Sequence, residues 1–235
     1  MTSVRSIAAA VLALAATPAL AHTGASGVAS ALDGFTHPFG GLDHVLAMVT
    51  VGLWAGTVGG RAVFAYPVAF LAFMAAGGAL GAGGVALPAV EAGIGLSVLV
   101  LGAAVAARPV ASSDSTEHVS IHSGRAHVRW RGPSVLGRTG LHFGGESSGL
   151  PLALGTALCA VFALFHGHAH GAEMAAGAGA AAYGAGFIAA TALLHGAGLA
   201  LALVFARGAG TATLVALPRL AGTAVAVAGA LMLVS

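Results

Sequence analysis

Hydrophobic residues occur in long runs along most of this chain, and short polar or glycine-rich turns separate the runs. Six runs have close to the roughly 20 residues that a helix needs to cross a bilayer. They lie at about 42–60, 63–82, 89–107, 151–172, 177–206 and 214–235. None shows the short alternating segments of a barrel, and lipid offers no partners for unpaired backbone groups. The pattern therefore predicts an all-α integral membrane protein with about six transmembrane helices.

The first 21 residues have a pattern of their own. Arg5 precedes a short apolar stretch, and Ala19-Leu20-Ala21 forms a small-x-small sequence. This arrangement is typical of a secretory signal peptide, and the stretch is short for the alternative, an uncleaved first span. We expect cleavage of residues 1–21, which would leave His22 at the mature N-terminus. Residues 22–235 would then form a single membrane domain.

The composition agrees with a membrane protein. Of the 235 residues, 58% are hydrophobic and only 7% are charged, whereas soluble domains carry about 25% charged residues. So few charges could not cover a surface that faces water. The net charge of +2 reflects this scarcity, so it gives no reason to expect a nucleic-acid partner. The 37 glycines are scattered through the apolar runs, where small residues allow helices to pack closely in lipid.

The arginines predict the orientation. The chain has nine arginines and no lysine, and all but Arg5 fall on one side of a six-helix arrangement. The positive-inside rule makes that side cytoplasmic. Both mature termini are then periplasmic, as the signal peptide independently requires. The polar segment at about 108–150 becomes a cytoplasmic loop, which we expect to be loosely folded; a weak alternation from Val119 to Trp130 leaves a short hairpin open.

Histidines gather in two clusters. The stretch His37-Pro-Phe-Gly-Gly-Leu-Asp43-His44 opens the first run, and Phe165-His166-Gly-His168-Ala-His170-Gly-Ala-Glu173 ends the fourth. The first run leads inward and the fourth leads outward, so both clusters lie near the outer ends of their helices. We therefore predict that the two clusters meet in the fold.

Helical geometry assigns a direction to these side chains. His166, His170 and Glu173 are spaced i, i+4, i+7 and share one face, whereas His168 points elsewhere. The neighbouring Asp43 and His44 point about 100° apart and are not equivalent ligands. His37, in the turn before the helix, is placed to fold back over the site.

These residue types favour a transition metal. Ionisable side chains within a span are rare and usually face a cavity or a partner. Imidazole with carboxylate suits Ni, Co, Zn or Cu, whereas Mg or Ca would require more oxygen ligands. Both carboxylates have an alternative role as helix caps or as partners that orient an imidazole, and His195 could instead form a hydrogen bond between helices. The predicted metal ligands are His37, Asp43, His44, His166, His170 and Glu173, with His22, His168 and His195 as further candidates.

The two clusters, together with Thr191-Ala-Leu-Leu-His195-Gly, resemble the HupE/UreJ family of nickel/cobalt permeases. The resemblance covers all six runs. It implies a multi-pass protein of the bacterial inner membrane, metal entry from the periplasm, and a link to hydrogenase or urease maturation. The family's first motif falls on His37, Asp43 and His44, and its second falls on His166 and Glu173. The long 108–150 segment departs from the family pattern, in which a short turn joins the third and fourth spans.

The function predicted from the sequence is uptake of nickel, or of cobalt, by a secondary transporter or facilitator. The metal is cargo, no prosthetic group is expected, and the protein is not expected to be an enzyme. No Gly-x4-Gly-Lys-Ser/Thr sequence is present, which disfavours a primary pump. Two alternatives remain open: a membrane-embedded metal-dependent hydrolase, and a periplasmic metal sensor, which would need no route past His195.

Overall fold

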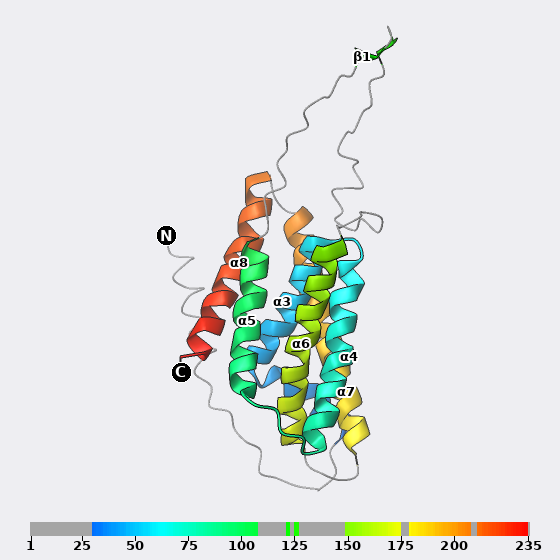
Figure 1. Cartoon of the computed structure of the whole chain (residues 1–235), viewed down its shortest axis with the longest axis vertical. Helices are drawn as coiled ribbons and strands as arrows, with labels where there is room; N and C mark the ends of the chain where they lie inside the picture. Colours follow the sequence, from blue (N-terminus) through cyan, green and yellow to red (C-terminus); the bar gives the residue numbers. More distant parts are fainter. Residues whose placement is uncertain are drawn as a thin grey trace.

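The described part of the chain contains six long helices, and they coincide within a few residues with the six predicted runs (Figure 1). They are α3 (Leu42–Val58), α4 (Ala62–Ala82), α5 (Val90–Ala106), α6 (Gly149–Glu173), α7 (Ala180–Arg207) and α8 (Thr211–Met232). A short helix α2 (Ala31–Thr36) and a 3-10 turn η1 (His37–Phe39) precede them. The computed structural model describes residues 30–107, 121–122, 125–126, 149–174, 179–207 and 211–234. The predicted signal peptide and His22 lie outside these residues, as does most of the 108–150 loop.

Three of these helices are long and apolar enough to cross a membrane. They are α4, α6 over Leu152–Glu173, and α7 over Ala180–Ala206. A fourth span results if α3 is counted with the α2–η1 segment, from which it is bent by 86°. Helices α5 and α8 are apolar but shorter. The helical, membrane-type architecture is therefore confirmed, while the number of six spans remains a prediction.

Part of the 108–150 loop is described. Strand β1 (Ile121–His122) pairs with strand β2 (Arg125–Ala126) in antiparallel register, with Ile121 opposite Ala126. This strand pair falls within the stretch from Val119 to Trp130 for which the alternation left a hairpin open, and it is the one departure from helical structure among the described residues.

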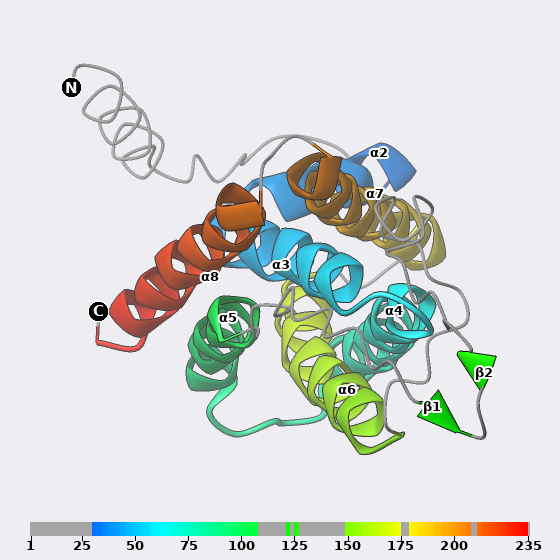
Figure 2. The same cartoon turned by 90° about the horizontal axis from the view of Figure 1, so that it is seen from above.

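Helix α3 lies at the centre of the bundle when the molecule is seen from above (Figure 2). It packs against α4, α5, α7 and α8, and its middle, including Met48 and Val51, is fully buried. The surrounding helices instead expose large apolar side chains such as Phe64, Leu193 and Leu220. An apolar surface of this extent is unfavourable in water, whereas a bilayer would solvate it.

Glycines bring the helices together in three close pairs: α3 with α7, α4 with α6, and α5 with α8. A Cβ atom on Gly198 would lie 2.0 Å from the carbonyl oxygen of Val49, and one on Gly167 would lie 2.0 Å from that of Met74. The backbones are thus closer than any side chain would permit. This agrees with the packing role expected for small residues, because helices in lipid associate mainly through such tight contacts.

The two ends of the bundle differ in chemistry. Helices α3, α5 and α7 begin at the end where α4, α6 and α8 finish, and both histidine clusters lie at that end. Arg61 and Arg207 lie at the opposite end, and Arg219 Nε donates a hydrogen bond to the Ala106 carbonyl oxygen there (3.1 Å). A cation at this position satisfies a carbonyl at the C-terminus of α5.

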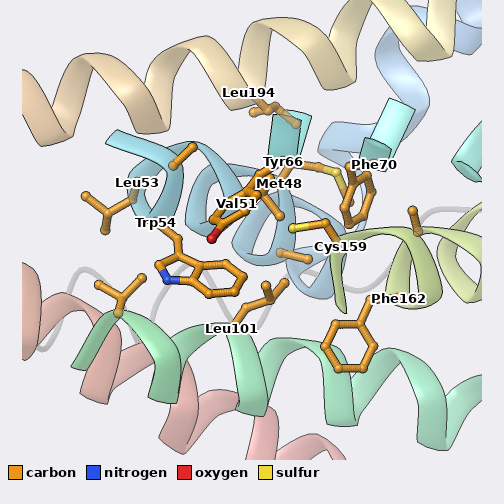
Figure 3. Packing of buried hydrophobic residues seen from close by; sticks show 14 of the residues in the cluster. Met48, Val51, Leu53, Trp54, Tyr66, Phe70, Leu101, Cys159, Phe162 and Leu194 are labelled. Atoms are coloured by element: carbon orange, nitrogen blue, oxygen red, sulfur yellow. The ribbon is translucent and has the colours of Figure 1, made fainter. Parts of the chain in front are cut away.

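A packed hydrophobic core fills the space between these ends (Figure 3). Its largest members include Met48, Trp54, Tyr66, Leu101 and Phe162, and the rings of Trp54 and Tyr66 lie 4.6 Å apart. These apolar side chains lie between the histidine end and the arginine end of the bundle.

Two neighbouring glycines of α7 test the packing argument. Gly198→Ala should destabilise the protein by about 1–3 kcal/mol, because the new methyl group overlaps the α3 backbone. Gly196→Ala should be neutral or slightly stabilising, since a Cβ there meets nothing within 4 Å and alanine favours a helix over glycine. Thermal unfolding of the purified protein in detergent measures both. Equal melting temperatures for the two variants would contradict the role of glycine at this contact.

Candidate metal site

The segment before α3 brings the first cluster over the bundle. Ser30 and Asp33 form a capping box at the start of α2, in which Ser30 N donates to the Asp33 carboxylate (2.9 Å) and Asp33 N donates to Ser30 Oγ (3.1 Å). Gly34 then allows α2 to lie directly against the backbone of Tyr183 in α7. The 86° bend that follows turns the chain into α3 and leaves His37 above the start of that helix.

The last turns of α6 carry the second cluster. Glycine contacts with α4 fix this part of α6 in place, since a Cβ on Gly171 would lie 2.1 Å from the Gly78 carbonyl oxygen. His166 and His170 face the first cluster, as their spacing predicts. His168 points away and donates from Nε2 to the carbonyl oxygen of Val85 (2.6 Å), in the connection between α4 and α5. The structure thus gives His168 a role in holding this connection.

Hydrogen bonds join the two clusters. His37 Nε2 lies 2.9 Å from His170 Nδ1, and His170 Nε2 lies 3.0 Å from His44 Nδ1. We call these three residues the imidazole chain. Glu173 Oε2 lies 3.4 Å from His37 Nε2 and 3.6 Å from His170 Nδ1. Residues separated by 126 and 133 positions in the sequence are therefore in direct contact, and His37 does fold back over the site.

Exposure falls steadily along this arrangement. The side chain of Glu173 is 63% exposed, that of His37 is 33% exposed and that of His170 is 15% exposed. His44 is fully buried. His166 is also fully buried, with its ring 5.5 Å from that of His44. The polar groups thus lead from the outer surface of the bundle into its interior.

Three of these residues could hold a metal ion together. Among the described residues, only His37, His170 and Glu173 form a group of possible ligands whose atoms all lie within 4.8 Å of one another. We call this set the outer group. Two imidazoles and a carboxylate form a donor set that suits first-row transition metals. An ion bound here would replace the hydrogen bond between His37 and His170.

Asp43 lies outside the outer group but close to the site. It is half-buried in the first turn of α3, where the helix dipole favours a negative charge. It immediately precedes His44 of the imidazole chain. Asp43 therefore contributes negative charge to the region in which a cation would lie.

Two residues near the site were missed by the sequence analysis. Phe187 of α7 packs against the rings of His37, His44 and His170, with centroid distances of 6.0, 5.0 and 4.9 Å. Ser97 of α5 is fully buried, and its Oγ lies 2.8 Å from His166 Nε2. Phe187 is one of several phenylalanines within the apolar runs and carried no signal. Ser97 is the only serine within these runs apart from the last residue, Ser235, which is a signal that the sequence analysis did not use.

A cavity of about 370 Å³ lies beside the site, between α4, α6 and α7. His170 and Tyr183 are the titratable residues in its lining, which otherwise consists of small or apolar residues such as Met74 and Gly78. Such a lining does not favour a hydrated ion. The exposed Glu173 and His37 offer the more polar approach to the site.

Comparison with known proteins identifies the family. The family model described as HupE / UreJ protein matches residues 10–127 and 145–232. The chain belongs to this family. Protein HupE of Rhizobium leguminosarum bv. viciae is 39% identical over 184 residues, which cover 78% of this chain and 76% of that protein. The matched segments contain both histidine clusters, and the unmatched residues between the two segments lie in the 108–150 loop. No solved structure matches the chain.

Removal of one histidine from the outer group should abolish binding at this site. His170→Ala should weaken Ni²⁺ binding to the purified protein by about 100-fold or more, because loss even of an outer-shell partner costs 10–100-fold. His168→Gln is the matched control, since glutamine can still donate to the Val85 carbonyl, and its affinity should be unchanged. Isothermal titration calorimetry measures both. A greater loss in His168→Gln than in His170→Ala would show that the ligands are misassigned.

Proposed function

We propose that this protein is a secondary transporter or facilitator that takes up divalent nickel, or cobalt, from the periplasm across the bacterial inner membrane. The decrease in exposure from Glu173 through His37 and His170 to His44 carries the proposal. A protein that only bound metal at its surface would not need metal-binding side chains that continue into the interior of the bundle. Membership of HupE/UreJ, a nickel/cobalt transporter family, supports it, as does the similarity to a protein named HupE.

The side chains of the site can replace part of the hydration shell of the ion. A dication is very costly to transfer into an apolar region unless it is paired. Glu173, at the exposed end, supplies a negative charge where the ion arrives, and Asp43 supplies a second one deeper in. Neutral imidazoles of His37 and His170 then provide nitrogen ligands in place of water. Because all four side chains are already in position, little ordering is required when the ion binds.

The orientation of the bundle supports uptake rather than export. The arginines at the end opposite to the site indicate a cytoplasmic side, so the outer group faces the periplasm, as do both mature termini. Inward movement of two positive charges gains roughly 4–5 kcal/mol at a membrane potential of 100 mV. The membrane potential alone is therefore a sufficient driving force.

Release to the cytoplasm requires a second conformation, because the hydrophobic core lies between the site and the arginine end. The close helix pairs suggest how the second conformation arises. His44 belongs to the α3–α7 pair, whereas His166, His170 and Glu173 belong to the α4–α6 pair. The site thus lies between two units that are each tightly packed. Relative movement of the two pairs would open a path without disrupting either pair.

The surroundings of the site are less suited to hydrolysis. Phe187 and Phe70 pack against the imidazoles, and in the described part of the chain no further group of polar side chains is placed to stabilise an oxyanion. We therefore favour transport over an enzymatic role. A link to hydrogenase or urease maturation is part of the same proposal, because those enzymes need nickel.

Uptake into proteoliposomes tests the function directly. With an inside-negative potential, the wild type should accumulate Ni²⁺ or Co²⁺ with saturable kinetics. His44→Ala and Glu173→Gln should lower the initial rate at least about tenfold, since each removes a ligand or a compensating charge. His168→Gln should transport at the wild-type rate. Normal Ni²⁺ binding without any uptake by the wild type would instead support a metal sensor.

The pH of the outer solution should control uptake. An imidazole must be neutral to coordinate a metal, and an ordinary histidine protonates near pH 6.5. Binding is therefore complete well above this pH and is lost as the pH falls through it. We expect the initial rate at subsaturating Ni²⁺ to fall steeply between pH 7 and pH 5, at a fixed membrane potential. An unchanged rate over this range would argue against histidine ligands.

A further inference from the structure

Four buried imidazoles among the described residues have ring nitrogens with no hydrogen-bond partner. They include Nε2 of His44, Nδ1 of His166 and both ring nitrogens of His195. None of these three residues is more than 3% exposed. A buried polar atom without a partner costs free energy, so several of them in one region of a bundle are unusual. We call these three residues the inner imidazoles; His168 Nδ1 is also unpaired, but it lies on the side of α6 that faces Val85.

The hydrogen bonds of Ser97 determine which nitrogen of His166 is free to bind. The Ser97 hydroxyl donates its only proton to the Ile94 carbonyl oxygen (2.6 Å). At its other contact, 2.8 Å from His166 Nε2, Ser97 Oγ must therefore accept. His166 thus carries its proton on Nε2 and presents the lone pair of Nδ1, which is the unpaired atom. This is how outer-shell partners commonly orient histidine ligands of metals.

The inner imidazoles come from three helices, α3, α6 and α7, and are linked by ring contacts. The ring of His44 (α3) lies 5.5 Å from that of His166 (α6). The ring of Phe70 packs against both His166 and His195, at 6.0 and 5.3 Å. The inner imidazoles do not meet the 4.8 Å spacing of the outer group, so their rings would have to turn towards an ion.

We propose that His44, His166 and His195 form a second metal position, deeper in the bundle than the outer group. His44 connects the two positions, because its Nδ1 contacts His170 of the outer group while its Nε2 is free. The inner position would accept a divalent transition metal that has already lost part of its water. It contains no carboxylate, so it should hold a dication less tightly than the outer group does. Weak binding is what onward movement requires.

This inference rests on the proposed function. A variant of His195 distinguishes failure of the inner position from failure of the proposed function. His195→Leu should bind Ni²⁺ in detergent within about twofold of the wild type, because the outer group is intact. Its initial rate of uptake should fall at least about tenfold. Uptake at the wild-type rate by His195→Leu would overturn the inner position while leaving transport established. Failure of the wild type to transport would instead overturn the proposed function.

A substitution of Ser97 provides a second test, and it alters the packing less than His195→Leu does. Ser97→Ala removes a single oxygen atom and leaves His166 without the acceptor that fixes its tautomer. We expect uptake to fall about tenfold, in the range found for loss of an outer-shell partner, with a small decrease in melting temperature because His166 Nε2 loses its partner. Ser97→Thr keeps the hydroxyl and should restore most of the rate. Wild-type uptake by Ser97→Ala would show that the lone pair of His166 Nδ1 is not used.

Discussion

The helices that carry the histidines meet at glycine, where the backbone of one helix lies against the backbone of the next. Transmembrane helices gain little from hydrophobic association in lipid, so close packing must hold them together. Gly52 and Gly198 hold α3 against α7, and Gly77 and Gly167 hold α4 against α6. These contacts build the two helix pairs between which the imidazole chain forms. A Cβ atom at any of them would lie 2.0–2.3 Å from a carbonyl oxygen of the facing helix, so the two helices would have to move apart.

Neutral histidines can be buried in such a bundle because their ring nitrogens form hydrogen bonds with one another. In the imidazole chain each contact joins one ring nitrogen to another, and Glu173 lies beside the exposed end. Burial of the same residues as cations would be costly. The arrangement therefore favours the neutral state, which is also the state that binds metal. The stability of the site without metal and its capacity to bind metal depend on the same protonation state.

The inner imidazoles differ from the imidazole chain in this respect. Their unpaired nitrogens represent a cost that packing elsewhere must offset, and unsatisfied buried polar groups in a native protein often have a functional explanation. An ion at this position would provide the unpaired nitrogens with a partner and so offset this free-energy cost. An outer group with a carboxylate, followed by deeper imidazoles without one, forms a gradient from tighter to weaker binding. A dication could move down this gradient under the membrane potential.

The sequence by itself determined the helices and the end of the bundle at which the chemistry lies. The lengths of the apolar runs define α3 to α8, and the alternating direction of successive helices places His44 and His170 at the same end. These features depend on local pattern and chain connectivity alone. Pattern does not determine how many helices cross the membrane, since α5 and α8 are apolar but short.

Only the tertiary structure decided which atoms meet. The bend before α3 places His37 on His170, the direction of His168 takes it to Val85, and Ser97 fixes the tautomer of His166. Each contact depends on how far a helix is rotated about its axis and how closely it approaches its neighbour. These quantities are set jointly by glycine contacts on several helices. The contacts of Ser97 and Phe187 with the histidines therefore arise only when the helices are assembled.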